Sequence, residues 1–260
     1  MSGLSSQGGR VVICGICAIC GRGFDVKRMA FTDENAERIA AGEKTETRRL
    51  VTEQQKKALL WAMQHHGWNP HAEDLEAEIP GLVRFALQAQ RPLDKTGLPI
   101  YRKRFRVQRD VGKAMRYRPG DVCAVAEALV PGDDDYARYR RDKKHAIHVG
   151  SPLKRLWTWD ACVLRACCMP VWAARDWVRV LEVRVERLQE ITAMAAIAEG
   201  IPRNRSVDSH VRAEQEVLAF KHLWDSIHAK EPGHGWKDNP LVWVVQFERT
   251  QKPLAADERG

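Results

Sequence analysis

The alternation of apolar and charged side chains over residues 176–188 constrains the fold more than any other feature of the chain. The run reads Asp-Trp-Val-Arg-Val-Leu-Glu-Val-Arg-Val-Glu-Arg-Leu, and a period of two is typical of a half-buried β-strand. Residues 26–31 indicate a first strand, and residues 241–247, rich in valine and tryptophan, indicate a last one. Helical patterns lie between these strands, at residues 32–41, 52–70, 191–199 and 206–228. We therefore expect an α+β domain with one mixed sheet or small barrel whose terminal segments pair.

A single domain is predicted over residues 26–250. A chain of 260 residues can bury a core without disulfide bonds. Residues 1–25 begin with a Ser/Gly-rich stretch and end in Gly-Arg-Gly, so we expect a flexible N-terminal appendage, and residues 251–260 form a C-terminal tail. Two insertions are expected within the domain: a polar, proline-punctuated segment at about 52–116 and a charged loop at about 131–160.

Charge and cysteine content limit the class of partner and the compartment. The formal charge of +8 and the pI near 9.2 favour an anionic partner, nucleic acid first. Seven cysteines, with Cys167 and Cys168 adjacent, argue against a disulfide framework and favour a reducing cytosol. The apolar stretch at residues 11–20 is too short to span a bilayer. We expect a cytoplasmic protein without a membrane partner.

A cluster of polar side chains follows the first predicted helix. Its members are Lys44, Thr47, Arg48 and Arg49. Gly42 follows the predicted helix over residues 32–41, at the position where a helix commonly ends with a residue in the left-handed backbone conformation. A glycine there sets the direction of the segment that follows. Lys44 and Thr47, three residues apart, can converge on one small polar group, and the planar forks of the two arginines suit phosphate or carboxylate. A solvated basic loop is the alternative reading of the same residues.

Four segments, taken together at their spacing, resemble the ASCH family of the PUA-like fold, in particular a group commonly encoded by bacteriophages and prophages. They are Gly-Glu-Lys-Thr-Glu-Thr-Arg-Arg at 42–49, Arg-Pro-Gly-Asp at 118–121 with Glu127, Met-Pro-Val-Trp-Ala-Ala-Arg at 169–175 running into 181–189, and Leu-Trp-Asp-Ser-Ile at 223–227 with Trp236 and 239–244. They cover most of residues 27–249. The resemblance implies a small, partly open, mixed β-barrel with surrounding helices, a large insertion and a cleft lined by the Lys44 loop.

The chain departs from this group at two points. After the Gly-Asp turn the group usually carries Trp-Val-Arg-Glu-Thr-Trp, whereas residues 124–129 read Ala-Val-Ala-Glu-Ala-Leu, which keeps Glu127 and loses the flanking aromatic and arginine. Val171 stands where the group commonly has arginine. Both departures remove groups that could touch a base or a phosphate.

Binding of RNA or of a modified nucleobase or nucleotide is the first function that the resemblance implies. The ligand would lie in a cleft around Lys44 and Thr47. The ligand-binding residues that we expect are Arg48, Arg49, Glu127, Trp159 and Trp172, with the arginines on phosphate and a tryptophan, Trp157 being a further candidate, stacked on a splayed base. Ordinary packing is the alternative for these tryptophans, and Trp177, Trp224 and Trp243 lie in apolar periodic segments that predict core positions.

Hydrolysis is the alternative function. Small bacterial ASCH proteins include an amidohydrolase that removes the acetyl group from N4-acetylcytidine with a lysine, a threonine three residues later and a glutamate on a short helix, and Lys44, Thr47 and Glu199 fall at those positions. A threonine hydroxyl needs a base, and a lysine serves only if its pKa, normally about 10.4, is lowered by burial or by a cationic neighbour. Glu199, in apolar surroundings, would protonate the leaving amine.

A morphogenesis or protein-interaction role without catalysis is a second alternative, because the basic charge could equally serve an acidic protein partner. The spacing of Cys14, Cys17 and Cys20 is ligand-like for zinc or an iron–sulfur cluster, but no fourth ligand follows nearby, and the intervening residues are apolar. No metal and no other cofactor is therefore expected.

Overall fold

The computed structural model describes residues 26–69, 73–88, 99–146, 156–203 and 209–253 of the chain. The predicted appendage at residues 1–25, with Cys14, Cys17 and Cys20, lies outside the described residues. The same is true of the middle of the second predicted insertion and of most of the predicted C-terminal tail.

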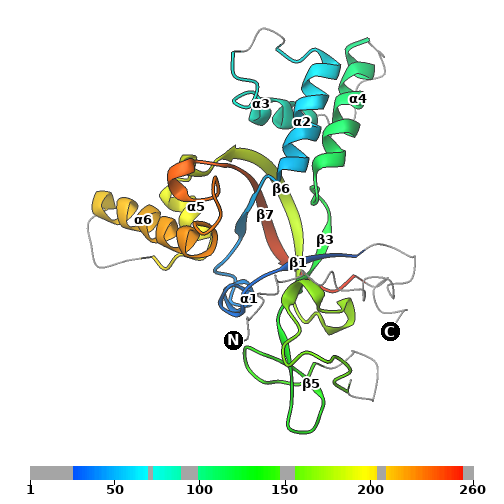
Figure 1. Cartoon of the computed structure of the whole chain (residues 1–260), viewed down its shortest axis with the longest axis vertical. Helices are drawn as coiled ribbons and strands as arrows, with labels where there is room; N and C mark the ends of the chain where they lie inside the picture. The colour runs from blue at the N-terminus through cyan, green and yellow to red at the C-terminus, as the bar shows by residue number, and fades with distance from the viewer. Residues whose placement is uncertain (1–25, 70–72, 89–98, 147–155, 204–208, 254–260) are drawn as a thin grey trace, which may run out of the picture.

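A five-stranded mixed sheet forms the centre of the molecule (Figure 1). Its strands, in spatial order, are β1 (Lys27–Ala30), β3 (Val122–Ala126), β6 (Trp177–Arg187), β7 (Leu241–Thr250) and β2 (Glu46–Leu50). β1 and β3 are parallel, and the other neighbours are antiparallel. The expected α+β class and mixed sheet are confirmed.

The first and last strands do not pair, contrary to the expectation from the sequence. β3 and β6 lie between β1 and β7, because α1 (Asp33–Ala40) carries the chain from β1 to the opposite edge, where β2 takes the place beside β7. Among the described strands no pairing joins the two edges, so the sheet is open and no closed barrel forms. A separate two-stranded sheet consists of β4 (Leu129–Pro131) and β5 (Ala137–Tyr139).

A β-bulge divides β6 into two halves. The register against β7 shifts between Val180 and Glu182. Val178 and Val180 before the shift and Val183 and Val185 after it are all buried in one core cluster, although they differ in sequence parity. The extra residue thus keeps the apolar side chains on one face of a strand that is too long to alternate without interruption.

The predicted helices are present, and the first predicted insertion is largely a helical lobe (Figure 1). The lobe contains α2 (Glu53–His66), α3 (Ile79–Gln88) and α4 (Pro99–Ala114), while α5 (Ala193–Ala198) and α6 (Ser209–His228) lie together elsewhere on the sheet. Short 3-10 helices are η2 (Ala166–Cys168), η3 (Val171–Ala173), η4 (Leu188–Glu190) and η5 (Trp236–Asp238). The side chain of Thr32 caps α1, and Gly42 follows the helix with a φ of 77°, as expected.

β7 is covered on both faces. Trp243 and Val245 belong to the cluster shared with β1, α1 and the helical lobe, whereas Val242 and Val244 belong to the cluster shared with α5 and α6. A third cluster of buried hydrophobic residues packs against β4 and β5. In the part of the chain that the structure describes, no helix is both long and apolar enough to cross a membrane.

Candidate functional site

The segment that carries Lys44 and Thr47 is fixed at Thr45 by two backbone hydrogen bonds. After Gly42, the Thr45 amide donates to the Ala198 carbonyl at the end of α5 (2.8 Å), and the Thr45 carbonyl accepts from the Phe247 amide of β7 (2.8 Å). The strand β2 then pairs with β7 from Glu46 onward. The loop and strand therefore hold their side chains in defined directions.

The candidate residues are divided between the two faces of this segment. Successive side chains of a strand alternate between faces. Arg48 lies over the Phe220 ring of α6 (5.7 Å), whereas Arg49 lies over the Phe31 ring on the other side (5.2 Å). Thr47 thus lies on the same face of β2 as Arg49. The Lys44 side chain lies on the face that carries Arg48.

Lys44 and Glu199 form a direct, buried ion pair. The Lys44 ammonium donates to Glu199 Oε2 and to the Glu199 backbone carbonyl, each at 2.6 Å. Glu199 ends α5, whose first turn is capped by Thr192, and both charged side chains are almost fully buried. Burial lowers the pKa of Lys44 below its usual range, and the neighbouring Arg49 and Arg48 act in the same direction, while Glu199 opposes the shift.

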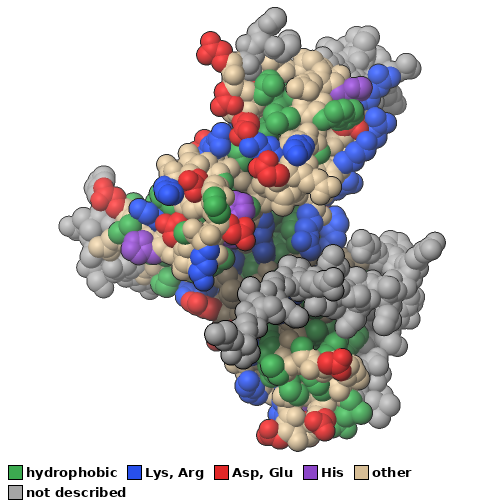
Figure 2. All heavy atoms as spheres, in the orientation of Figure 1, with side chains coloured by type: hydrophobic (Ala, Val, Ile, Leu, Met, Phe, Trp, Pro, Cys, Tyr) green, Lys and Arg blue, Asp and Glu red, His purple; other side chains and the backbone are tan. Residues whose placement is uncertain are grey.

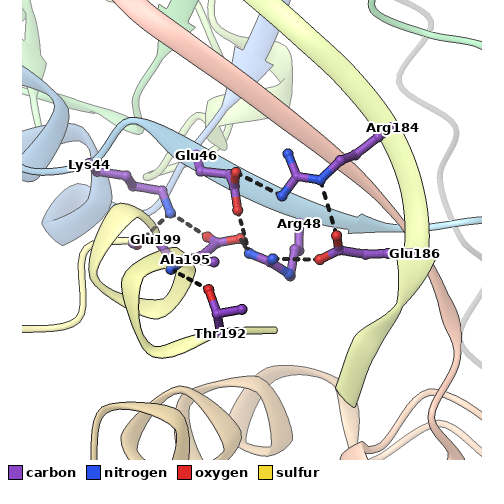
Figure 3. A network of polar contacts seen from close by, with 8 residues as sticks. All are labelled: Lys44, Glu46, Arg48, Arg184, Glu186, Thr192, Ala195 and Glu199. Carbon is purple, nitrogen blue, oxygen red and sulfur yellow. Dashed lines mark hydrogen bonds and ion pairs between the residues drawn. The ribbon is translucent and has the colours of Figure 1, made fainter. Parts of the chain in front are cut away.

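Four more charged residues extend this pair into a network with three cations and three carboxylates (Figure 3). They are Glu46, Arg48, Arg184 and Glu186. Arg48 bonds Glu46 at 2.8 Å, Glu186 at 2.5 Å and Glu199 at 3.3 Å. Arg184 bonds Glu46 at 3.0 Å and Glu186 at 3.1 Å. Every carboxylate thus contacts two cations, which is the arrangement that buried charges require.

Thr47 does not join this network. Its side chain is buried on the opposite face of β2, and among the described residues no hydrogen bond links its hydroxyl to Lys44 or Glu199. Of the three residues expected for hydrolysis, the structure brings together the lysine and the glutamate and leaves the threonine apart. A base must reach the proton of its nucleophile, and this contact is missing here.

Arg49 has a different environment from Arg48. It donates a hydrogen bond to the Ala30 carbonyl at 2.6 Å, and no carboxylate lies within ion-pair distance of it in the described part of the chain. Burial lowers its pKa from the usual arginine value. Arg48 forms ion pairs with three carboxylates, whereas Arg49 forms none among the described residues.

Glu127 belongs to a separate cluster. Its two carboxylate oxygens each accept a hydrogen bond from Arg175 at 2.8 Å, and Arg141 lies at 3.3 Å. The Arg175 guanidinium also lies over the Tyr139 ring at 3.8 Å. These contacts tie β3 to the β5 hairpin and do not bring Glu127 into the Lys44 network.

The candidate stacking tryptophans pack in the cluster under β4 and β5. The rings of Trp157 and Trp159 meet edge to face with centroids 4.8 Å apart, and both, like Trp172, are partly buried there. Trp177, Trp224 and Trp243 are buried, as predicted.

Sequence reasoning identified Lys44, Arg48 and Glu199 and missed the other three residues of the network, Glu46, Arg184 and Glu186. Arg184 and Glu186 are charged positions of the alternating run at 176–188, and Glu46 lies within the polar cluster after the first predicted helix. Only the pairing of β2 and β6 with the same central strand brings them together. A signal was available in the matched charges, since each strand carries both signs at positions two residues apart. Among the described residues, no group of three or more His, Cys, Asp or Glu side chains is arranged to hold a metal ion.

Fold and site together define an α+β protein with an open five-stranded mixed sheet and a buried, charge-balanced network at the base of its edge strand. Comparison of the chain with protein-family models, with curated proteins and with solved structures gave no match.

Proposed function

We propose that this protein is an ASCH-type domain of PUA-like fold that binds RNA, or a modified nucleobase or nucleotide, beside Lys44 and Thr47. The observation that carries the proposal is the contrast between Arg48 and Arg49. The ionic network neutralises Arg48 and fixes the strand, while Arg49, on the Thr47 face, has no carboxylate partner among the described residues. A positioned cation without an ion-pair partner favours an anionic ligand.

Exposed basic side chains continue from this face along the helical lobe. Arg106, Arg109 and Lys113 follow one another at helical spacing on α4, and Arg116 comes just after the helix. Figure 2 shows lysine and arginine side chains along this side of the lobe. Asp110 partly neutralises Arg109 and Lys113, so Arg106 and Arg116 carry most of the available charge. Such a stripe suits a phosphate backbone.

Titration of short fluorescent RNA and DNA, at two salt concentrations, tests this proposal. We expect binding that weakens as salt rises, because each phosphate contact releases counterions. An Arg106→Gln/Arg116→Gln variant should bind more weakly and show a smaller salt dependence. An Arg165→Gln variant, which removes an exposed arginine outside the stripe, is the matched control. Absence of binding at both salt concentrations would contradict the proposal.

Hydrolysis of an N4-acetylated cytidine is the second candidate, and one observation favours it. The Lys44 ammonium lies 2.6 Å from Glu199 Oε2, and burial lowers its pKa, which is what a lysine base with a neighbouring acid needs. To act, Lys44 would have to exchange Glu199 for the Thr47 hydroxyl.

Mass spectrometry of N4-acetylcytidine incubated with the wild-type protein tests this candidate. Thr47→Val removes the hydroxyl and keeps the shape of a buried side chain, so it separates chemistry from folding. We expect deacetylation that Thr47→Val abolishes if the candidate is right. Equal product with both proteins, or none with either, rejects it.

A further inference from the structure

A pocket of about 130 Å³ lies on the Arg49 face of the sheet, away from the Lys44 network. Arg49 and Trp243 form its floor with two valines of β6 and β7, and Thr52 and Gln55 contribute from the start of α2. Leu50 of β2 and the two residues Arg116 and Tyr117, which follow α4, complete the lining.

The sheet register places the two main floor residues side by side. Arg49 of β2 and Trp243 of β7 are directly opposite each other in the antiparallel ladder, and both lie on the face that packs against the helical lobe. Residues directly opposite on one face have neighbouring side chains. The pocket therefore has a floor on rigid strands.

Both floor residues carry a buried hydrogen-bond donor that has no acceptor among the described residues. These donors are Arg49 Nε and Trp243 Nε1. Trp243 is only 5% exposed, so water has little access to accept a hydrogen bond from its indole N–H. A buried donor without an acceptor bears its whole desolvation cost, and two such donors on one small pocket indicate a missing acceptor.

The polar side chains Tyr117, Gln55 and Thr52 of the lining are already hydrogen-bonded within the protein. Tyr117 donates its hydroxyl proton to the Arg28 carbonyl. Gln55 donates to the Ala114 carbonyl at 2.9 Å, and its side-chain oxygen accepts from the Thr52 amide at 3.0 Å. The unoccupied hydrogen-bonding capacity of the pocket thus lies in arginine and indole donors.

The two charged side chains of the pocket lining, Arg49 and Arg116, are both cationic, and Glu199 acts on Arg49 electrostatically without forming an ion pair with it. No carboxylate within the described residues pairs with Arg49 or Arg116, and Arg116 is exposed at the pocket. The 14-residue helix α2 begins at the pocket, and its N-terminus adds a partial positive charge. Glu53, the acidic residue of its first turn, is not part of the lining.

We propose that this pocket binds a phosphate-type oxyanion, held by Arg49 Nε and Trp243 Nε1 on the floor and by Arg116 from the solvent side. Its volume is below the roughly 300 Å³ at which pockets for whole drug-sized ligands begin, so a phosphate group fits and a whole nucleoside does not. The oxyanion can be free inorganic phosphate or the phosphate of a nucleotide. Only the second source rests on the proposed nucleic-acid function.

Observation of the Trp243 indole N–H by NMR tests the proposal directly. The signal is assigned by its loss in Trp243→Phe, which removes the donor and keeps an aromatic ring. We expect titration of the wild-type protein with inorganic phosphate to shift this signal progressively to saturation, with matching heat in calorimetry. An unshifted Trp243 signal and no heat up to tens of millimolar phosphate would overturn the proposal, because then solvent alone fills the pocket.

Two variants separate the site from general charge effects. Arg49→Gln removes the cation, and Trp243→Phe removes one donor, so each should weaken phosphate binding by about tenfold or more. Arg165→Gln, outside the lining, should bind phosphate as the wild type does. Equal weakening by Arg165→Gln would refute a specific site. Far-ultraviolet circular dichroism confirms folding, and the wild-type titration remains decisive if a variant is unfolded.

A 5′-mononucleotide and its nucleoside distinguish the two sources of the oxyanion. If the nucleotide binds more tightly than inorganic phosphate and shifts the same indole signal, the pocket is the phosphate subsite of the proposed ligand. If inorganic phosphate binds and neither nucleotide nor RNA does, the oxyanion site stands and the proposed nucleic-acid function falls. If RNA binds while Trp243 stays unshifted by phosphate and by nucleotide, the proposed function stands and this site falls.

Discussion

The Lys44 ammonium and the Glu199 carboxylate, 155 positions apart in the chain, meet at 2.6 Å with both side chains out of solvent. The pair joins the loop before β2 to the end of α5. Because Glu199 also contacts Arg48, which lies over the Phe220 ring of α6, the pair adds a polar link between the sheet and the helices α5 and α6. The contribution of the Lys44–Glu199 pair to the free energy of unfolding can be measured.

Lys44→Met should lower the free energy of unfolding by about 3 to 5 kcal/mol, because it leaves the Glu199 carboxylate buried with only its longer contact to Arg48. Urea denaturation measures the change. Lys57→Met, at an exposed position of α2, should change stability by less than about 0.5 kcal/mol. The double variant Lys44→Met/Glu199→Gln should lose less than the sum of its single changes. A loss for Lys44→Met no larger than that for Lys57→Met would show that the pair contributes nothing.

Gly200→Ala should destabilise the protein more than Gly42→Ala. Both glycines have positive φ, 95° and 77°, so either alanine incurs a backbone cost of about 1 to 2 kcal/mol. A Cβ at Gly42 meets nothing within 4 Å, whereas one at Gly200 lies 2.9 Å from Arg38 Cδ and 3.5 Å from Lys44 Cβ. Thermal unfolding of the two variants compares them, and an equal loss would show that the space around Gly200 adjusts freely.

The free energy of unfolding should fall steeply in acid because Asp110 becomes protonated. Burial alone would raise its pKa, but hydrogen bonds from Lys113, Arg109 and His66 outweigh burial and hold the pKa well below the ordinary 3.8. A carboxyl group with a lowered folded-state pKa stabilises fully above the unfolded value and loses this contribution as the pH falls below it. The stabilisation therefore disappears progressively below about pH 4.

Asp110→Asn checks the sign of this dependence. The variant should be less stable at neutral pH, by about 2 kcal/mol, because several charge-assisted hydrogen bonds are lost. Below pH 4 its stability should fall less steeply than that of the wild type. Denaturation curves recorded at a series of pH values give both quantities, and parallel pH profiles for the two proteins would exclude a lowered pKa at Asp110.

The described cysteines should differ sharply in reactivity. Cys162 and Cys167 are exposed, whereas Cys123 is buried in the sheet, and burial, helped by Asp121, raises its pKa to about 12. Because the thiolate is the reactive species, Cys123 should be alkylated only when the protein unfolds. Peptide mapping after brief alkylation, without and with denaturant, measures this. Modification of Cys123 in the native protein at the rate of Cys162 would contradict its burial.

Local patterns predicted elements well and their partners poorly. The alternation over 176–188 identified β6, and Gly42 identified the end of α1, because both depend on nearby residues alone. The bulge at Val180 and Glu182 was not predictable, since it arises from pairing with β7. The charge network was missed for the same reason. Glu46 is a local neighbour of Arg48 on β2, but Arg184 and Glu186 reach this pair only because β2 and β6 both pair with β7, which lies far from β2 in sequence.

The division of β2 into two faces has a consequence for the accuracy of folding. β2 is an edge strand, and edge strands are prone to slip or to pair with another chain. A slip of one residue would turn Arg49 toward Glu186 and Glu199. It would also carry Glu46 and Arg48 onto the apolar side of the sheet, away from the other charges of the network. The inward-facing ions therefore penalise every alignment of this strand except the native one, and they guard the sheet against misassembly with other copies of the chain.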